Sequence, residues 1–245
     1  MSRLKKLTVI TSMLGACAIT AQAIAAPDFD QTFLSDYSKL QPRTAGQISD
    51  LVYIAPDGYA RLGKYDSVAL DQPEILVSPG SDYKGGKPED MAQIAEHMRS
   101  ALATKLTEGG YKVVDQPGPS VILVRLALTD LEMKKKKRRL LAYTPIGAVV
   151  KAGADAVKEA MDKVDITGMT LQGELLDGET GEVLAALVVP RETPPGEKEM
   201  RMDFDELTAL VNEYGARMRC SLDNARVAEE SRVDCLDPAA RAAGR

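Results

Sequence analysis

A long strand-like run, SVILVRLALTDLE at residues 120–132, sets the first requirement on the fold. Successive side chains of a strand point to opposite faces of its sheet. One face here carries Val124, Leu126 and Leu128, and the other carries Leu123, Arg125 and Ala127. The run therefore predicts a long strand, around which the other elements must be arranged.

Two segments with helical periodicity accompany this strand. Pro88 opens the first helix, and Gly109 ends it. The second helix starts near Asp203, with Glu206 three residues later as the partner in a capping box. Their apolar stripes are Met91, Ile94, Met98, Leu102 and Leu106, and Phe204, Leu207, Val211, Tyr214 and Met218.

Shorter runs predict the remaining strands. They are YDSVALDQPEILV (65–77), YKVVD (111–115), and a hairpin of MTLQGELL (169–176) and EVLAALVV (182–189). The resulting order is β-α-β-β, a helical insertion, then β-β-α. This order predicts an α+β fold, in which a mixed sheet has its helices packed on one face.

Two segments flank the domain predicted at 65–220, and the one before it lacks the sustained periodicity of the domain's helices and strands. Residues 26–64 are rich in turn formers and predict an N-terminal arm laid across the domain, which spans 65–220, with a tail at 221–245. Within the arm, 43–47 predict a turn, and DLVYIAP (50–56) predicts a short edge strand. The expected apolar anchors of the arm are Phe33, Leu34, Tyr37 and Leu40.

The first residues have the three parts of an export signal. Arg3, Lys5 and Lys6 form a positive region, and residues 7–16 an apolar region too short to span a membrane. The sequence therefore predicts a bacterial protein that works outside the cytoplasm.

This signal has two possible ends. Leu-Gly-Ala-Cys resembles a lipobox, in which Cys17 is lipidated and the signal is 1–16. The small residues that follow fit ordinary cleavage instead, with a signal of 1–25. The first end predicts a tethered lipoprotein, and the second a soluble periplasmic protein.

Cys220 and Cys235 form an even pair once Cys17 is set apart. In an oxidising compartment such a pair predicts a disulfide, here one that staples the tail to the preceding helix. Closing a loop of about 15 residues stabilises a fold by roughly 3 kcal/mol in the chain-entropy model. Two unpaired thiols are the alternative.

The charge balance excludes some partners. The formal net charge is −5, and removing the positive export signal makes the mature chain more acidic. An acidic chain is a poor nonspecific binder of nucleic acid. Aromatic residues make up only 4% with no Trp, which argues against an aromatic-lined sugar or ligand cleft.

One basic run interrupts this acidic chain inside an insertion predicted at 133–164. It consists of Lys134, Lys135, Lys136, Lys137, Arg138 and Arg139. Such a run predicts contact with an anionic surface, whether lipid headgroups, lipopolysaccharide phosphates or an acidic envelope protein. A solvated loop is the alternative. The residues after it have helical periodicity and predict a docked or interfacial helix.

No catalytic set can be assembled from the candidate residues. His97 is the only histidine and is predicted to lie on a helix surface. The loop at 80–87, GSDYKGGK, has the wrong spacing for a phosphate-binding loop. Glu174 and Asp177 lie beside a predicted turn, where carboxylates are usually solvated. The sequence therefore predicts no catalytic residue, no metal site and no cofactor.

Four segments together resemble one family: FLSDYSKLQP, YDSVALDQPEI, VVDQPGPSVILVRLALTDLE and ELLDGETGEVLAALV. The set, over about residues 32–220, is similar to a family of bacterial envelope proteins, many of them lipoproteins, known as domain of unknown function 3313. The resemblance implies export, favours a lipidated Cys17, and implies the outer membrane because Ala18 follows that cysteine. It brings no catalytic residues, and the continuous basic run departs from the family pattern. The order of elements is also similar to envelope lipoprotein domains that activate cell-wall synthases, which is an analogy of fold alone.

The function expected from these features is that of a non-enzymatic binding or scaffolding module of the cell envelope. The insertion at 133–164 is its expected contact surface. The alternatives are an envelope hydrolase that uses carboxylates, and a soluble periplasmic structural or stress-related protein.

Overall fold

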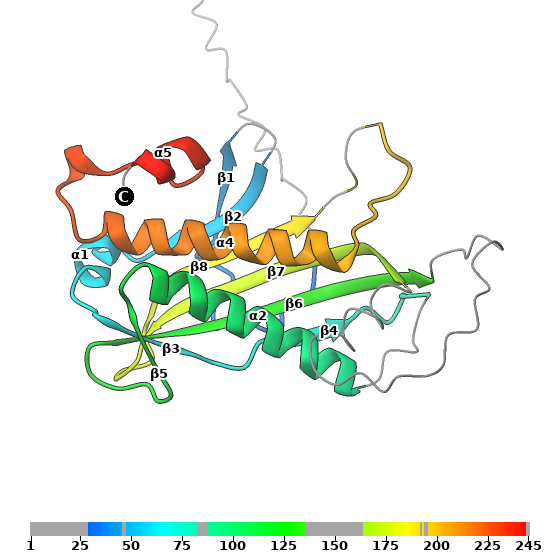
Figure 1. Ribbon diagram of the computed structural model, residues 1–245, viewed down its shortest axis with the longest axis horizontal. Helices are drawn as coiled ribbons and strands as arrows, with labels where there is room; N and C mark the ends of the chain where they lie inside the picture. The colour runs from blue at the N-terminus through cyan, green and yellow to red at the C-terminus, as the bar shows by residue number, and fades with distance from the viewer. Residues whose placement is uncertain are drawn as a thin grey trace, which may run out of the picture.

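The computed structural model describes residues 29–45, 48–82, 88–135, 164–191, 193 and 196–243. These residues form one eight-stranded mixed sheet, and the two long helices α2 and α4 lie side by side across one of its faces (Figure 1). The strands run in the order β1-β2-β8-β7-β6-β3-β5, and β4 also pairs with β6. This architecture confirms the predicted α+β class.

The strands are β1 (Gln41–Ala45), β2 (Ile48–Ile54), β3 (Ser67–Leu70), β4 (Glu74–Val77), β5 (Lys112–Val114), β6 (Val121–Lys135), β7 (Val164–Asp177) and β8 (Val183–Arg191). The helices are α1 (Gly58–Leu62), α2 (Pro88–Glu108), α4 (Phe204–Asn224), the short 3-10 helix η1 (Glu229–Ser231) and α5 (Pro238–Ala243). The predicted central strand, both long helices and the hairpin are confirmed, and β6 and β7 are longer than predicted.

Along β6, the side chains buried under the helices are at even-numbered positions in the first half and at odd-numbered positions in the second half. Between Thr129 and Glu132 its pairing with β7 shifts, because Asp130 and Leu131 together stand opposite Met169 alone. Asp130 has a φ of 52°, a left-handed conformation that aspartate tolerates better than most residues. Such a bulge reverses the alternation of the residues beyond it. The side chains that β6 packs under the helices are therefore Ile122, Val124 and Leu128 before the bulge and Leu131 and Met133 after it.

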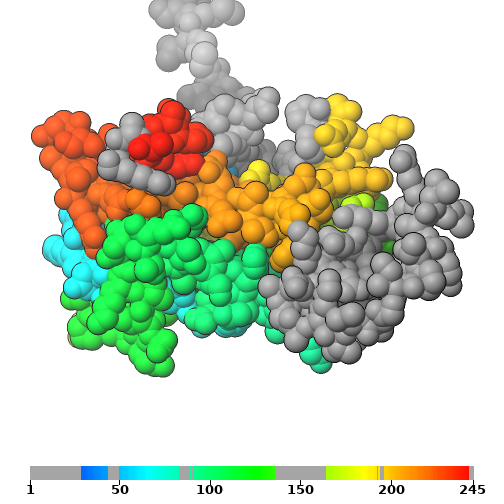
Figure 2. All heavy atoms as spheres, in the orientation of Figure 1, coloured from blue at the N-terminus to red at the C-terminus, as the bar shows by residue number. Residues whose placement is uncertain are grey.

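The two long helices form a tight layer over this face, as Figure 2 shows. α4 begins with the predicted capping box, in which Asp203 and Glu206 each accept a hydrogen bond from the backbone N–H of the other. Gly215 lets α4 approach α2 closely, because a Cβ there would lie 3.3 Å from Leu102 Cδ1. Two clusters of buried side chains lie between the helices and the sheet.

Residues 29–40 cover the opposite face of the sheet. Phe33 and Leu34 are buried there against side chains of β6 and β8, and Tyr37 and Leu40 pack beside them. The predicted anchors of an N-terminal arm are thus confirmed. The sheet is covered on both faces, by helices on one and by this segment on the other.

Two local predictions for the arm are wrong. The residues predicted as a turn at 43–47 belong in part to strand β1, and β2 lies between β1 and β8 instead of at the edge. Leu51 of β2 pairs with Val188 of β8, a partner far away in the sequence. Local periodicity carries no signal of such a pairing, which is why both predictions fail.

The predicted strand at 65–77 is two strands. β3 and β4 both run parallel to β6, at successive positions along it. The chain leaves the ladder between them at 71–73, where Pro73 has no N–H to donate.

The predicted insertion at 133–164 is shorter in the structure. Met133, Lys134 and Lys135 are the last residues of β6, and Val164 is the first of β7. Lys134 forms an ion pair with Glu199 and lies 3.9 Å from Asp82. The rest of the basic run, 136–139, and the helix predicted after it lie outside the described residues.

Candidate functional site

A cavity of about 450 Å³ lies between α4 and the sheet, at the border of the two core clusters. Leu126 and Leu175 line it from the sheet, and Val211 and Met218 line it from α4. Leu126, Leu175 and Met218 remain partly exposed although they lie between the helical layer and the sheet. Side chains in a filled interior would be fully buried, so this layer is hollow.

Three small residues are among those that line the cavity: Gly173 of β7, Ala185 of β8 and Gly215 of α4. A Cβ at Gly173 would lie only 2.9 Å from Leu126 Cδ2, so this glycine gives the leucine side chain its room. The lining thus draws on β7, β8 and α4 together.

Arginines and a tyrosine stand at the mouth of the cavity. Arg43 and Arg217 line it, together with Tyr214. Arg217 stacks on the Tyr214 ring at 5.0 Å, and Arg191 lies 5.7 Å from the same ring. Burial is the main cause that raises the pKa of Tyr214, and the nearby arginines oppose it. The phenol therefore stays neutral, and the charged groups here are the guanidinium groups and the carboxylates of Asp50 and Glu213 that pair with them.

Each of these arginines keeps a buried N–H without a partner. Arg43 Nη2 donates to Asp50 Oδ2 at 2.9 Å, and Arg217 Nε donates to Glu213 Oε1 at 2.9 Å. Among the described residues, however, no acceptor reaches Arg43 Nε, Arg191 Nε or Arg217 Nη1. Buried polar groups are rarely left unpaired, so these three donors, together with the equally unpaired acceptor Asp50 Oδ1, mark an incompletely paired polar region around Tyr214.

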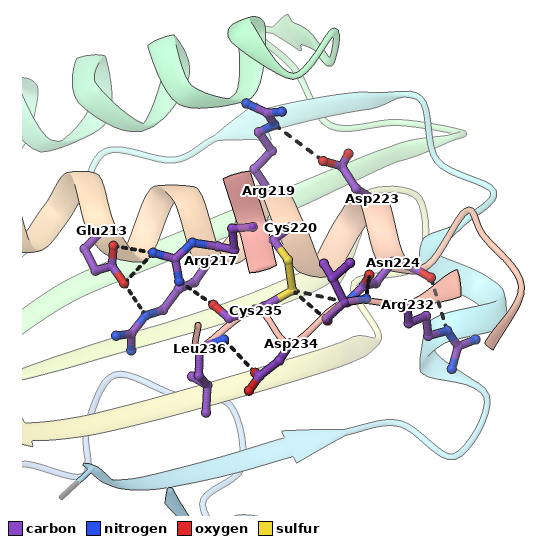
Figure 3. The surroundings of a disulfide bond; sticks show 12 residues. Glu213, Arg217, Arg219, Cys220, Asp223, Asn224, Arg232, Asp234, Cys235 and Leu236 are labelled. Carbon is purple, nitrogen blue, oxygen red and sulfur yellow. Dashed lines mark hydrogen bonds and ion pairs between the residues drawn. A yellow bond between two sulfur atoms is a disulfide. The ribbon is translucent and has the colours of Figure 1, made fainter. Parts of the chain in front are cut away.

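Residues 233–236 of the C-terminal tail also line the cavity. Figure 3 shows how the tail is attached to α4. The predicted disulfide joins Cys220 of α4 to Cys235 of the tail, with their Cα atoms 5.7 Å apart. Asn224 holds Val233 through two hydrogen bonds, donating to its carbonyl at 2.8 Å and accepting from its N–H at 3.0 Å. Arg241 Nη2 pairs with both carboxylate oxygens of Glu213, at 2.6 and 2.7 Å. The wall that the tail contributes is thus fastened to α4 at several points.

A buried polar network lies on the opposite face, beneath residues 29–40. Glu174 is 2% exposed, so the prediction that it is solvated is wrong. It pairs with Arg125 and accepts hydrogen bonds from Ser35 N at 3.0 Å and Ser35 Oγ at 3.1 Å. The error arose because β7 carries Glu174 into the sheet interior before the turn begins.

Gln172 extends this network. Its amide nitrogen donates to the carbonyl of Asp30 at 2.7 Å and to Thr129 Oγ1 at 2.8 Å. Its amide oxygen accepts from the Tyr37 hydroxyl at 2.6 Å. Both amide N–H groups and the amide oxygen of this fully buried side chain are thus bonded, and two of the three bonds hold the N-terminal segment on the sheet.

Asp177 is also engaged within the fold. Its carboxylate accepts a hydrogen bond from the Tyr65 hydroxyl and from the turn N–H groups of Glu179 and Thr180. These bonds, the one from Tyr65 foremost, lower the pKa of Asp177 to about 2. A carboxylate held ionised in this way is a poor general acid.

Replacing Tyr65 with phenylalanine is expected to raise the pKa of Asp177 from about 2 toward its ordinary value of 3.8. Because the folded-state pKa is the lower one, ionised Asp177 stabilises the fold above the ordinary pKa and loses this effect as the pH falls. The stability difference between wild type and Tyr65→Phe should therefore shrink as the pH falls from 3.8 to about 2. Carboxyl ¹³C shifts from NMR titration measure the pKa directly. Tyr111→Phe, which removes a bond to Asp223 instead, is the control; an Asp177 that titrates near its ordinary value in the wild type would contradict the assignment.

His97 lies between the two long helices and is partly buried, so its predicted surface position is wrong. Its Nε2 is 3.1 Å from Thr208 Oγ1, and its ring packs 5.1 Å from that of Phe204. Residues on one stripe of a helix cannot reveal that a second helix will pack beside it. The imidazole thus links α2 and α4.

The other predicted site residues are placed as follows. Cys17 and most of the loop at 80–87 lie outside the described residues. Within the described ranges there is no cluster of His, Cys, Asp and Glu that could hold a metal ion, and no helix long and apolar enough to cross a membrane. The cavity and its arginines were not predicted, because they depend on the pairing of β1, β2 and β8.

Comparisons with known proteins give one family and several solved structures. The model of the family described as "Protein of unknown function (DUF3313)" matches residues 30–218. No curated protein matches the sequence.

Three solved structures illustrate the similarity. A PelC dodecamer from Paraburkholderia phytofirmans is 14% identical, with a TM-score of 0.35 over 71% of this chain and 95% of that chain. A variant of this dodecamer is 15% identical, with a TM-score of 0.36 over the same 71% of this chain and 95% of that chain. A minor lipoprotein from Acinetobacter baumannii is 12% identical, with a TM-score of 0.26 over 66% of this chain and 95% of that one. Since the family model spans most of the residues, the chain belongs to the DUF3313 family of proteins of unknown function.

Proposed function

We propose that this is an exported protein of the bacterial cell envelope, tethered to the outer membrane through a lipidated Cys17 and acting as a non-enzymatic binding or scaffolding module. The three-part N-terminal pattern supports export. The Cys220–Cys235 disulfide supports an oxidising compartment, where such bonds form and persist. A soluble periplasmic protein is the alternative.

The docked N-terminal segment is the observation that carries this proposal. Asp30 N donates to Asp130 Oδ1 at 3.0 Å, and Ser35 is bonded to buried Glu174. Eleven residues separate Cys17 from Phe29. Fully extended, they reach at most about 40 Å. A lipid on Cys17 would therefore hold the domain close to the bilayer by a fixed point on the sheet.

That fixed point lies near the basic run. Asp130 and Lys135 are both on β6, five residues apart. At about 3.3 Å per residue this places them roughly 16 Å from each other. The tether and the basic run thus belong to the same end of the domain, so we infer that the run faces the anionic membrane surface. Lys134 pairs with Glu199, so we assign the membrane contact to the basic residues 136–139, which follow β6.

Hydrolysis by paired carboxylates has less support. Glu174 is paired with Arg125 beneath the N-terminal segment, and Asp177 is held ionised by Tyr65. A glycosidase needs one carboxylic acid protonated and a second carboxylate facing it across a cleft. These two side chains instead serve the fold.

The tether is tested by the intact mass and membrane fractionation of the protein from its host. We expect a mature chain that begins at Cys17 with a diacylglyceryl adduct, and release of the Cys17→Ser variant from the membrane fraction. Thr20→Ser, a similar change in the same segment, should remain in the membrane fraction. A mass that begins at Ile24 or Ala26 would refute the tether and favour the soluble form.

The membrane contact is tested with vesicles of anionic and of neutral lipid and the Cys17→Ser chain. Replacing the four positives at 136–139 with glutamine should abolish the salt-sensitive binding to anionic vesicles, since each contributes about 1 kcal/mol near such a surface. The matched control replaces four other positives, Lys39, Lys64, Arg99 and Lys112, and should leave binding nearly intact. Equal loss in both variants would show that net charge, and no particular surface, governs binding.

A further inference from the structure

We propose that the cavity beneath α4 binds a long-chain fatty acid, with the acyl chain between the helix and the sheet and the carboxylate at Arg43 and Arg217. This site lies on the helix-covered face of the sheet. It is separate from the N-terminal segment and from the basic run, and it does not depend on lipidation of Cys17.

The size and lining of the cavity suit an acyl chain. Its volume of about 450 Å³ is within the range of roughly 300–1,000 Å³ that small-molecule sites occupy. The inner wall is almost entirely aliphatic, with Leu126, Leu175, Leu187 and Met218 among its residues. Because this wall is closed by α4 on one side and by the sheet on the other, it fits a slender chain better than a folded partner.

The mouth supplies what a carboxylate head requires. Arg43 and Arg217 both line the cavity, and each has a buried N–H without an acceptor among the described residues. Asp50 and Glu213 already accept from other nitrogens of these two groups. A carboxylate offers two acceptor oxygens with four lone pairs, and its hydrogen bonds with guanidinium groups are strong ones. An alcohol head has a single oxygen and would offer these unpaired N–H groups fewer acceptor positions.

The approach to the mouth is also apolar. Ile54, at the end of β2, lines the cavity and is 43% exposed, which is unusual for isoleucine. Val52 on the same face of β2 lies deeper and is partly exposed. An exposed aliphatic side chain is therefore continuous with the lining of the cavity.

Competition binding with the delipidated Cys17→Ser chain tests this assignment. A fluorescent fatty acid serves as the reporter, and dodecanoate and dodecan-1-ol are the competitors, which differ only in the head. We expect dodecanoate to displace the reporter at about tenfold lower concentration than the alcohol, as charge-assisted hydrogen bonds to the head imply. The protein contains no Trp, so its own fluorescence does not interfere.

Variants separate the head from the chain. In the double variant Arg43→Gln/Arg217→Gln, dodecanoate and dodecan-1-ol should displace the reporter at the same concentration. The control Arg99→Gln, which changes an arginine on α2 outside the cavity, should keep the tenfold preference for the acid. Ala185→Met, which adds bulk inside the cavity, should weaken both competitors alike. Thermal unfolding of each variant establishes that it is folded.

Two results would overturn the proposal. Failure of the wild-type chain to bind the reporter would show that no acyl chain enters the cavity. Equal displacement by acid and alcohol in the wild type, or a preference that survives loss of both arginines, would refute the assigned position of the carboxylate.

Discussion

Replacing Glu174 with alanine is expected to lower the free energy of unfolding by about 3 kcal/mol, because it leaves a partly buried charge without its partner. Arg125 would keep only Asp71 and Glu74, at 3.9 and 3.8 Å, and Ser35 would lose the acceptor of its N–H and its hydroxyl. Urea denaturation of the mature chain measures this change.

Glu179→Ala is the matched control, since that carboxylate lies exposed on the neighbouring turn and should change stability little. Limited proteolysis adds a local readout: in Glu174→Ala, residues 29–40 should be cleaved faster than in either the wild type or the control. If Glu174→Ala unfolds at the same urea concentration as Glu179→Ala, the network does not hold the segment in the way described.

Removing the disulfide should have an effect of similar size. The double variant Cys220→Ala/Cys235→Ala is expected to be less stable by about 3 kcal/mol, because the bond closes a loop of 15 residues and restricts the unfolded chain. Asn224 and Arg241 would still hold the tail, so the folded state should remain the same. Urea denaturation with and without reductant provides the measurement.

The reduced wild type should unfold together with the double variant, which separates loss of the bond from any effect of the new alanines. Ser231→Ala, an exposed change within the same loop, should unfold like the oxidised wild type. An oxidised wild type no more stable than the double variant would mean that the disulfide contributes nothing to the stability of the domain.

The elements defined by local signals were predictable from the sequence. α2 and α4 follow from their apolar stripes and end signals, and the capping box at Asp203 is readable from two residues. The hairpin of β7 and β8 has a turn rich in residues that tolerate positive φ, and Gly181 has a φ of 74°. The disulfide follows from the even pair of cysteines that remains once Cys17 is set apart.

The features that depend on distant pairing were not predictable. β1 and β2 join the sheet only because β2 pairs with β8, and that pairing brings Arg43 to the mouth of the cavity. The cavity lies where β7, β8 and α4 meet, and no local pattern of the sequence reveals that meeting. Glu174 is close to a turn in the sequence, and that position alone predicts a solvated side chain. Its burial involves Ser35, which lies 139 residues earlier and which local sequence does not reveal.

This separation also determines when the N-terminal segment can fold. During synthesis the segment emerges first, yet its partners Gln172 and Glu174 emerge only after most of the chain. Contacts between such distant residues form slowly, since a long loop must close before they stabilise anything. We therefore expect residues 29–40 to dock only after β7 has formed, and the face of the sheet beneath them to stay open until then.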